Sequence, residues 1–444
     1  MARKLHAAIA LLTTMLVLAG CGASGTSGSP ANVRVSAGDV DSVQLTRPVE
    51  LLFWHRQTGE SEILQQQLID EFMAANPNIR IKAETLGDYD KLYQKTLSAI
   101  QANAAPDLVA AYESQAAEYY EAGALVPFDE YIKSTKYGLT QAQVRDYIPS
   151  FLEATKFAQY GGKSLTFPYT KSDLVMYTNM EALRSLGFDA PAATWDEFLA
   201  HCRKAVSLNR QCYAMSIDAS TFAAIVYSNG GSLVNEQGTK SRLDEPAVTK
   251  TMQLYETLGR EKLAYQIQGT DDQNDLLSGK AVYMIRTSTA LPRLAAGFGD
   301  NSRWDVSIIP QGTTDKKATV LFGANISIMK STPEKQLAAW TFIKYLSQPE
   351  VTARWGLHPS NGYFPLRQSA LEKPEAIQFL EENPHFKTAF EIARVAQVEP
   401  SARGWQEVRR LIQDSLTAIV TGQATAAQAQ QTLTEKANQA LANP

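Results

Sequence analysis

An alternation of strand and helix patterns near the start of the chain most constrains its fold. Asn76-Pro77 ends the first helix pattern, because a residue before proline disfavours the helical conformation. The helices show apolar residues at spacings of three and four, and the strands are short apolar or alternating runs. The order predicts a parallel α/β sheet. The elements are strand 49–54, helix 60–75, strand 78–84, helix 88–103 and strand 108–112.

Four side chains lie at or just beyond the carboxyl ends of these strands or at the starts of the following helices. They are Trp54, His55, Tyr89 and Glu113. In open parallel sheets, ligands bind outside the carboxyl ends of the strands. Their position therefore makes these four residues candidates for a binding site.

The rest of the chain continues the mixed pattern. Residues 164–179 predict one or two strands, and 279–294 predict a strand, a Ser/Thr-rich turn and a helix. Thr194 and Glu197 have the spacing of a capping box at the start of a helix. Two amphipathic or Ala/Gln-rich helices are expected over 405–420 and 425–441. No repeat of 20–50 residues is present.

The N-terminus has the organisation of an export signal. A basic head at Arg3 and Lys4 precedes an apolar run, and Leu18-Ala19-Gly20-Cys21 follows. This ending resembles a bacterial lipobox, so we expect residues 1–21 to be a lipoprotein signal peptide with Cys21 as the lipidated residue. Residues 22–47 are rich in Gly, Ser and Ala, which is typical of a flexible tether. We expect an exported protein that contacts the membrane through its lipid anchor only, at the outer face of the cell membrane or in the periplasm.

Composition and motifs exclude several classes of function. The 444 residues are 44% hydrophobic, enough for two or three domains, and 42 basic against 46 acidic residues give a net charge of −4. Nucleic acid is therefore not expected as a partner. The five histidines are scattered, and no metal-binding, phosphate-loop or nucleophile motif is present, so we expect no metal, no cofactor and no enzymatic activity. Cys202 and Cys212 either form a disulfide or stay as two buried thiols.

The order of short motifs along the chain resembles the extracellular solute-binding proteins of ABC importers, the group that contains maltose-binding protein. The resemblance implies a two-lobed α/β periplasmic-binding-protein fold of type II, with a ligand cleft between lobes joined by a multi-crossing hinge. It also implies ABC permease subunits as partners and a monomeric protein. The motifs are 76–77, 105–108, 177–179 with 191–197, 277–284 and 347–350. The expected lobes are 48–170 plus 322–362 and 171–321 plus 363–444, with hinge crossings near 167–172, 320–323 and 361–365.

A narrower resemblance is carried by the segments 53–55, 87–89, 112–113, 323–324, 361–365 and 408–409. These segments resemble those of binding proteins for sn-glycerol 3-phosphate and glycerophosphodiesters. Arginine, hydroxyl groups and free backbone N–H groups suit a phosphate, and a glutamate suits the glycerol hydroxyls. Arg410 adjoins Arg409, and the resemblance leaves open which of the two faces the cleft. The ligand positions that it implies are Tyr89, Glu113, Ser172, Thr287, Gly323, Tyr363 and Arg409. Further candidates are Trp54, His55, Asp218 and Ser288.

Two other interpretations stay open. A neutral mono- or oligosaccharide would use Trp54, Tyr112 and Glu113, because sugar sites combine aromatic platforms with carboxylates. A secreted carbohydrate-active enzyme is the third class, because carboxylate pairs are not recognisable from sequence spacing. One departure from the narrower resemblance is the lack of tryptophan in 213–222, where Asp218 instead suits a cationic or hydroxylated head group such as choline.

Overall fold

The N-terminal alternation builds the first of two mixed sheets. The computed structural model describes residues 37–267, 269–312 and 315–442. Within these, a five-stranded sheet has the order β2-β1-β3-β13-β6, in which β1 pairs in parallel with β2 and β3. The predicted parallel start of the sheet is therefore confirmed, and the late strand β13 joins it in antiparallel orientation. The strands are β1 (Val49–His55), β2 (Ile79–Thr85), β3 (Leu108–Ala111), β6 (Phe167–Pro168) and β13 (Asn325–Ile328).

The middle of the chain builds the second sheet around the fully buried strand β7. The order is β14-β12-β7-β10-β8-β9, and β11 also pairs with β7. A separate hairpin joins β4 (Lys156–Phe157) and β5 (Lys163–Ser164). The strands of the second sheet are β7 (Ser172–Asn179), β8 (Tyr213–Met215), β9 (Ala264–Gln266), β10 (Tyr283–Thr287), β11 (Trp304–Ser307), β12 (Thr319–Phe322) and β14 (Ala396–Gln397). We call the parts built around the first and second sheets lobe 1 and lobe 2. The two-sheet α/β architecture agrees with the predicted fold class.

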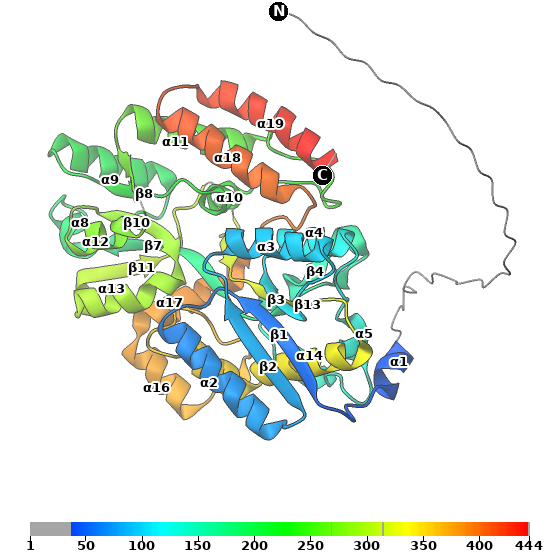
Figure 1. The fold of residues 1–444 in the computed structure, drawn as a ribbon. Helices are drawn as coiled ribbons and strands as arrows, with labels where there is room; N and C mark the ends of the chain where they lie inside the picture. The colour runs from blue at the N-terminus through cyan, green and yellow to red at the C-terminus, as the bar shows by residue number, and fades with distance from the viewer. Residues whose placement is uncertain (1–36, 268, 313–314, 443–444) are drawn as a thin grey trace, which may run out of the picture. The chain divides into compact units, whose positions relative to one another are not determined.

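Helices cover both sheets, and α18 and α19 pack against α11 beside the second sheet (Figure 1). The capping box is present, since the Glu197 N–H donates to Thr194 Oγ1 at 3.2 Å and the Thr194 N–H donates to Glu197 Oε2. The earlier helices are α1 (Ala37–Ser42), α2 (Glu60–Ala75), α3 (Tyr89–Gln101), α4 (Glu113–Glu121), α5 (Asp129–Lys133), α6 (Gln141–Arg145), α7 (Pro149–Glu153), α8 (Met180–Arg184), α9 (Trp195–Ser207) and α10 (Ala219–Ser228). The later ones are α11 (Pro246–Arg260), α12 (Asp271–Leu277), α13 (Leu291–Phe298), α14 (Pro333–Leu346), α15 (Pro349–Gly356), α16 (Pro374–Glu382), α17 (Pro384–Ile392), α18 (Trp405–Val420) and α19 (Ala426–Ala442).

The chain passes between the two sheets through short segments that hydrogen-bond to one another. The first passage links β6 of the first sheet to β7 of the second, and the second passage links β12 of the second sheet to β13 of the first. The Thr170 N–H donates to the Ala324 carbonyl at 3.0 Å, and the Phe364 N–H donates to the Lys171 carbonyl at 2.7 Å. The one or two strands predicted over 164–179 are therefore the end of β5 followed by β6 and β7, and residues 169–171 between β6 and β7 belong to the passage.

Helix α1 (Ala37–Ser42) lies within residues 22–47, the range predicted as a tether. Helix α1 packs near α5, with Val40 buried and the Asp41 carboxylate accepting hydrogen bonds from Ser134 and Thr135. These bonds hold the pKa of Asp41 at about 2. The predicted signal peptide, Cys21 and residues 22–36 lie outside the described residues. In the part of the chain that is described, no helix is both long and apolar enough to cross a bilayer.

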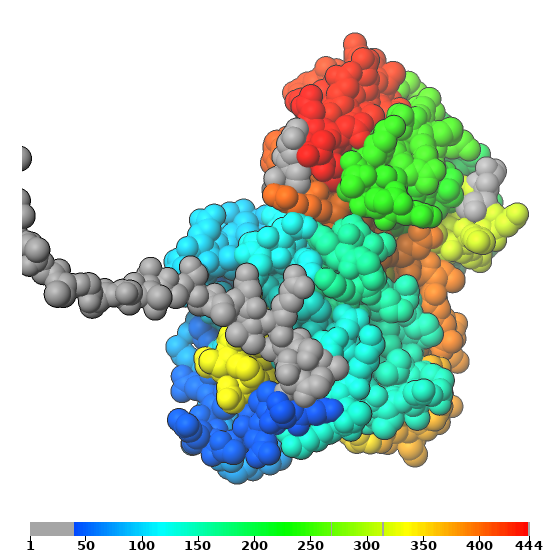
Figure 2. All heavy atoms as spheres, turned by 90° about the vertical axis from the view of Figure 1, so that its right-hand side faces the viewer, coloured from blue at the N-terminus to red at the C-terminus, as the bar shows by residue number. Residues whose placement is uncertain are grey.

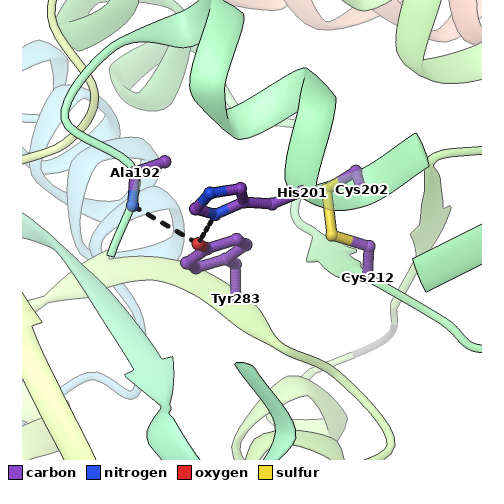
Figure 3. The surroundings of a disulfide bond; sticks show 5 residues. All are labelled: Ala192, His201, Cys202, Cys212 and Tyr283. Carbon is purple, nitrogen blue, oxygen red and sulfur yellow. Dashed lines mark hydrogen bonds between the residues drawn. A yellow bond between two sulfur atoms is a disulfide. The ribbon is translucent and has the colours of Figure 1, made fainter. Parts of the chain in front are cut away.

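A disulfide joins Cys202 on α9 to Cys212 just before β8, with their Cα atoms 5.1 Å apart (Figure 3). This decides between the two alternatives that the sequence left open. Beside it, His201 Nδ1 and the Tyr283 hydroxyl are 2.6 Å apart, and the Tyr283 hydroxyl also accepts from the Ala192 N–H. Burial lowers the pKa of His201, so the ring is neutral at pH 7. The disulfide thus ties α9 to the segment that leads into β8 in lobe 2.

Replacing both Cys202 and Cys212 by serine should destabilise the protein by about 2–3 kcal/mol, because the bridge closes a loop with a sequence separation of 10. For an ordered chain of this size that corresponds to roughly 3 °C in melting temperature. Calorimetry of the oxidised protein and the double variant measures the difference. An unchanged melting temperature would mean that the bridge does not constrain the unfolded chain.

Candidate functional site

A cavity of about 310 Å³ opens where segments of both lobes meet. Five of the predicted ligand positions line it, although they are spread from residue 89 to residue 363. The fold therefore brings together five of the seven residues that the resemblance implies as ligand positions. The lining residues are Arg56, Gln57, Thr58, Ser61, Tyr89, Tyr112, Ser172, Thr287, Thr289, Phe322, Gly323, Ser360, Asn361, Gly362 and Tyr363.

Several of the lining side chains are positioned by the end of a helix or a strand. Tyr89 is the first residue of α3, whose N-cap Asp88 accepts from the Lys91 N–H at 2.8 Å. Ser172 begins β7, and Thr287 ends β10 with its hydroxyl 2.6 Å from that of Thr289. The Tyr89 and Tyr112 rings lie 4.4 Å apart, which makes an aromatic wall next to these hydroxyl groups.

Gly323 lies in the second passage between the sheets and has a φ of +99°. A Cβ atom there would be 1.9 Å from the Thr170 carbonyl oxygen. Only glycine permits this close approach of the two passages. Gly362 permits another close approach, because a Cβ there would be 2.2 Å from the Ser288 carbonyl oxygen. The Ser288 hydroxyl donates to the Gly362 carbonyl at 2.7 Å and holds that contact.

Glu113 lies beside the cavity rather than in its wall. It is the first residue of α4 and lines a neighbouring small cavity of about 20 Å³, which shares Tyr112, Phe322 and Gly323 with the larger one. Its carboxylate accepts from Asn325 Nδ2 at 2.7 Å and lies 3.5 Å from Lys171 Nζ. Lys171 is fully buried, and burial lowers its pKa despite the nearby carboxylate.

Arg409 also lines the small cavity, but its guanidinium is already occupied. It forms an ion pair with Glu399, and Nη1 contacts the Ser220 hydroxyl at 3.0 Å. Trp405 Nε1 donates to the same Glu399 carboxylate at 3.2 Å. Burial alone would lower the pKa of Arg409, but Glu399 more than offsets this, so the net shift is upward. The guanidinium stays charged and is neutralised by its neighbour.

Arg410 points away from this site. Its guanidinium is exposed and pairs with Glu407 and Asp414 on the same helix. Of the two adjacent arginines, only Arg409 lines the small cavity, whereas both line the cavity of about 770 Å³ that is described below.

The side chains of the four further candidates contact other protein groups, and none of the four lines the cavity of about 310 Å³. Trp54 Nε1 donates to Glu84, and Lys95 lies over its ring. His55 is buried, which lowers its pKa to about 4, and its Nδ1 accepts from the Gln57 N–H. Asp218 caps α10 by accepting from the Thr221 N–H and hydroxyl. Ser288 makes the contact with Gly362 that is described above.

Sequence reasoning missed Arg56 and Glu399. Arg56 directly follows the first strand, and the rule that ligands bind beyond carboxyl strand ends would have included it. No sequence signal pairs Glu399 with Arg409, because the carboxylate lies in a loop between β14 and α18.

A third cavity, of about 770 Å³, lies between α3 and α4 of lobe 1 and α18 of lobe 2. Figure 2 shows the red surface of α18 and α19 above the cyan surface of the first lobe. One direct hydrogen bond crosses here, from Gln406 Nε2 to the Ser114 hydroxyl at 2.6 Å. This cavity and the small one share Gln406 and Arg409, so the three cavities follow one another along the cleft.

Comparison with known proteins identifies the class. The chain belongs to the family described as bacterial extracellular solute-binding protein, whose profile matches residues 67–388. It is 22% identical over 409 residues to the sn-glycerol-3-phosphate-binding periplasmic protein UgpB of Escherichia coli, covering 88% of this chain and 92% of that protein.

Solved structures with the same fold bind different ligands. UgpB of Mycobacterium tuberculosis, in complex with glycerophosphocholine, has a TM-score of 0.77 at 22% identity and covers 88% of this chain and 98% of that one. The cyclic alpha-maltosyl-1,6-maltose binding protein of Arthrobacter globiformis has a TM-score of 0.76 at 17% identity, with coverages of 89% and 100%. MalE of Xanthomonas citri, a sugar-binding protein, has a TM-score of 0.75 at 18% identity, with coverages of 89% and 98%.

These findings confirm the predicted class and fold. The protein is the solute-binding component of an ABC importer, it acts outside the cytoplasm, and its family is not enzymatic. The third interpretation, a secreted enzyme, is thereby excluded. The importer's permease is the partner that the family implies.

Proposed function

We propose that the protein captures glycerol 3-phosphate or a glycerophosphodiester and delivers it to the importer's permease. The observation that carries this proposal is the convergence of Tyr89, Ser172, Thr287, Gly323 and Tyr363 on one cavity. Phenolic and aliphatic hydroxyls there donate to phosphate oxygens, and Gly323 lets the backbone approach the ligand. Glu113 borders the neighbouring cavity and accepts hydrogen bonds from the glycerol hydroxyls.

Capture proceeds by closure of the two lobes around the ligand. The hydrogen-bonded passages at Thr170–Lys171 and Gly323–Ala324 are the hinge, and they lie next to the cavity. A ligand that touches both lobes binds the closed form more tightly and so shifts the equilibrium towards it. The permease then recognises the closed protein. We also propose that a lipid on Cys21 anchors the protein, which acts as a monomer.

A neutral sugar is the second candidate ligand. It is favoured by Glu113 and Glu399, two carboxylates beside Tyr112 in the small cavity, because carboxylates accept hydrogen bonds from sugar hydroxyls. Trp54 also belongs to this interpretation, but its Nε1 donates to Glu84 and Lys95 lies over its ring, and it does not line the cavity of about 310 Å³. Glu113 and Tyr112 would then carry the recognition.

Melting curves with a ligand panel distinguish the candidates. The panel contains glycerol 3-phosphate, glycerophosphocholine, inorganic phosphate, maltose, cellobiose and trehalose. A ligand at 100 times its dissociation constant adds about 2.7 kcal/mol, which raises the melting temperature by roughly 3 °C. We expect this shift with the phosphate esters and none with the sugars. A shift with a sugar alone would contradict the phosphate proposal and leave the importer role intact.

A further inference from the structure

The charge of the cavity of about 310 Å³ is carried by one residue. Of the fifteen lining residues, Arg56 is the only one that is charged at pH 7, and none is a carboxylate. The small cavity differs, because Glu113 and Glu399 there outnumber Arg409. The cleft therefore has a positive compartment and, next to it, a compartment rich in carboxylate oxygens.

Arg56 has no acceptor for its guanidinium among the described residues. Its Nε is buried and unpartnered, and the group lies over the Tyr89 ring, 5.3 Å from the centroid. The Tyr89 hydroxyl is also buried without a partner. An unsatisfied buried donor destabilises the folded protein, and more so when the donor is charged. Two such donors in the wall of one cavity indicate a ligand that brings acceptor oxygens.

Arg409 is the less suitable cation, although the resemblance favours it. Its charge is compensated by Glu399, and it would have to give up that ion pair before it could receive a second anion. A phosphate placed there would also meet the Glu399 and Glu113 carboxylates. A phosphate beside Arg56 would meet no carboxylate in the cavity lining, and the nearby Asp88 charge is outside that lining and helps to raise the pKa of Arg56.

We infer that Arg56 is the residue that binds the anionic phosphate oxygens of the ligand, together with the Tyr89 hydroxyl. This inference rests on the proposed function and deepens it. Arginine presents a planar fork of donors that matches phosphate oxygens. The hydroxyls of Ser172, Thr287 and Thr289 surround the remaining oxygens. The ligand's hydroxyl-bearing part extends towards Glu113 and the Arg409–Glu399 pair, so its orientation is set by the charge difference between the two compartments.

The test is isothermal titration calorimetry of the protein and the variants Arg56→Gln and Arg184→Gln with glycerol 3-phosphate. Arg184 is exposed on α8, so its replacement removes one positive charge away from the cavity. We expect Arg56→Gln to bind at least about 30-fold more weakly, because it leaves a desolvated phosphate without its charged partner. Arg184→Gln should stay within threefold. The dissociation constant of the protein should also rise steeply with NaCl, and this dependence should flatten in Arg56→Gln.

The melting temperature measured without ligand shows whether a variant that binds more weakly is still folded. Arg56 makes no ion pair among the described residues, so Arg56→Gln should melt at the same temperature as the parent or higher. If the parent binds glycerol 3-phosphate and folded Arg56→Gln binds it within threefold, the assignment of Arg56 is overturned while the proposed function stands. If the parent binds a sugar and no phosphate ester, both are overturned.

Discussion

Replacing Gly323 by alanine is expected to lower the melting temperature by about 4–6 °C and to weaken ligand binding at least tenfold. The left-handed backbone at φ +99° costs an alanine about 1–2 kcal/mol. The new Cβ would be 1.9 Å from the Thr170 carbonyl, so the two passages between the sheets must separate, which adds about 2–3 kcal/mol. Calorimetry measures the first effect and titration with the ligand found in the panel measures the second.

Gly422→Ala is the matched control for this prediction. Gly422 has a φ of +74°, but a Cβ there would meet nothing within 4 Å. This variant therefore has the backbone cost without the clash and should lose only about 1–2 °C, with unchanged affinity. Equal losses in both variants would mean that the contact between the passages is not needed for the hinge.

Replacing Arg409 by alanine is expected to destabilise the protein by about 2–3 kcal/mol at pH 7, or roughly 3 °C. The loss arises because Glu399 would keep its charge without a partner in a mostly buried position. The magnitude is reduced from that of a fully buried pair, since the Arg409 and Glu399 side chains keep 24% and 15% of their exposure. Thermal unfolding of the single variant measures this loss directly.

The pH dependence of that difference follows from Glu399. Burial raises the pKa of this carboxyl, but Arg409 outweighs it, so the folded value lies below the unfolded one. The stabilisation by the pair is therefore present above the unfolded pKa, about 4.3, and is lost as pH falls through the folded pKa. The gap between the protein and Arg409→Ala should narrow below pH 4.

The double variant Arg409→Met, Glu399→Gln supplies the control. It removes both charges and keeps the side-chain volumes, so at least half of the lost stability should return at pH 7. If it is no more stable than Arg409→Ala, the loss does not come from an uncompensated carboxylate.

Much of the fold could be predicted because its signals are local. The apolar periodicity of residues 60–75 and the proline stop after them define α2, and Thr194 with Glu197 defines the start of α9. The break of 163–179 into three strands was not predictable in the same way. It depends on Tyr169–Lys171 meeting Ala324 and Phe364, which are distant in sequence.

Only part of the candidate site could be predicted, because the site also depends on contacts between residues that are distant in sequence. Tyr89, Ser172, Thr287, Gly323 and Tyr363 were chosen by position in the resemblance, and the fold brings them to one cavity. What a side chain is already bonded to does not show in a sequence. Asp218 is used as a helix cap and Arg409 is paired with Glu399, so neither is free in the way that its residue type suggested. Arg56, which makes no ion pair among the described residues, looked like an ordinary loop residue.

The attachment of α1 has a mechanical consequence. Asp41 is held by Ser134 and Thr135, and the Tyr137 hydroxyl donates to the Val43 carbonyl at 2.7 Å. A force that pulls on the chain ahead of Ala37 therefore acts on lobe 1 and not across the hinge. Lobe 2 carries no such restraint from this segment and is the half free to swing. When the protein is immobilised experimentally through the chain ahead of Ala37, a probe on lobe 2 should therefore report opening and closing more sensitively than one on lobe 1.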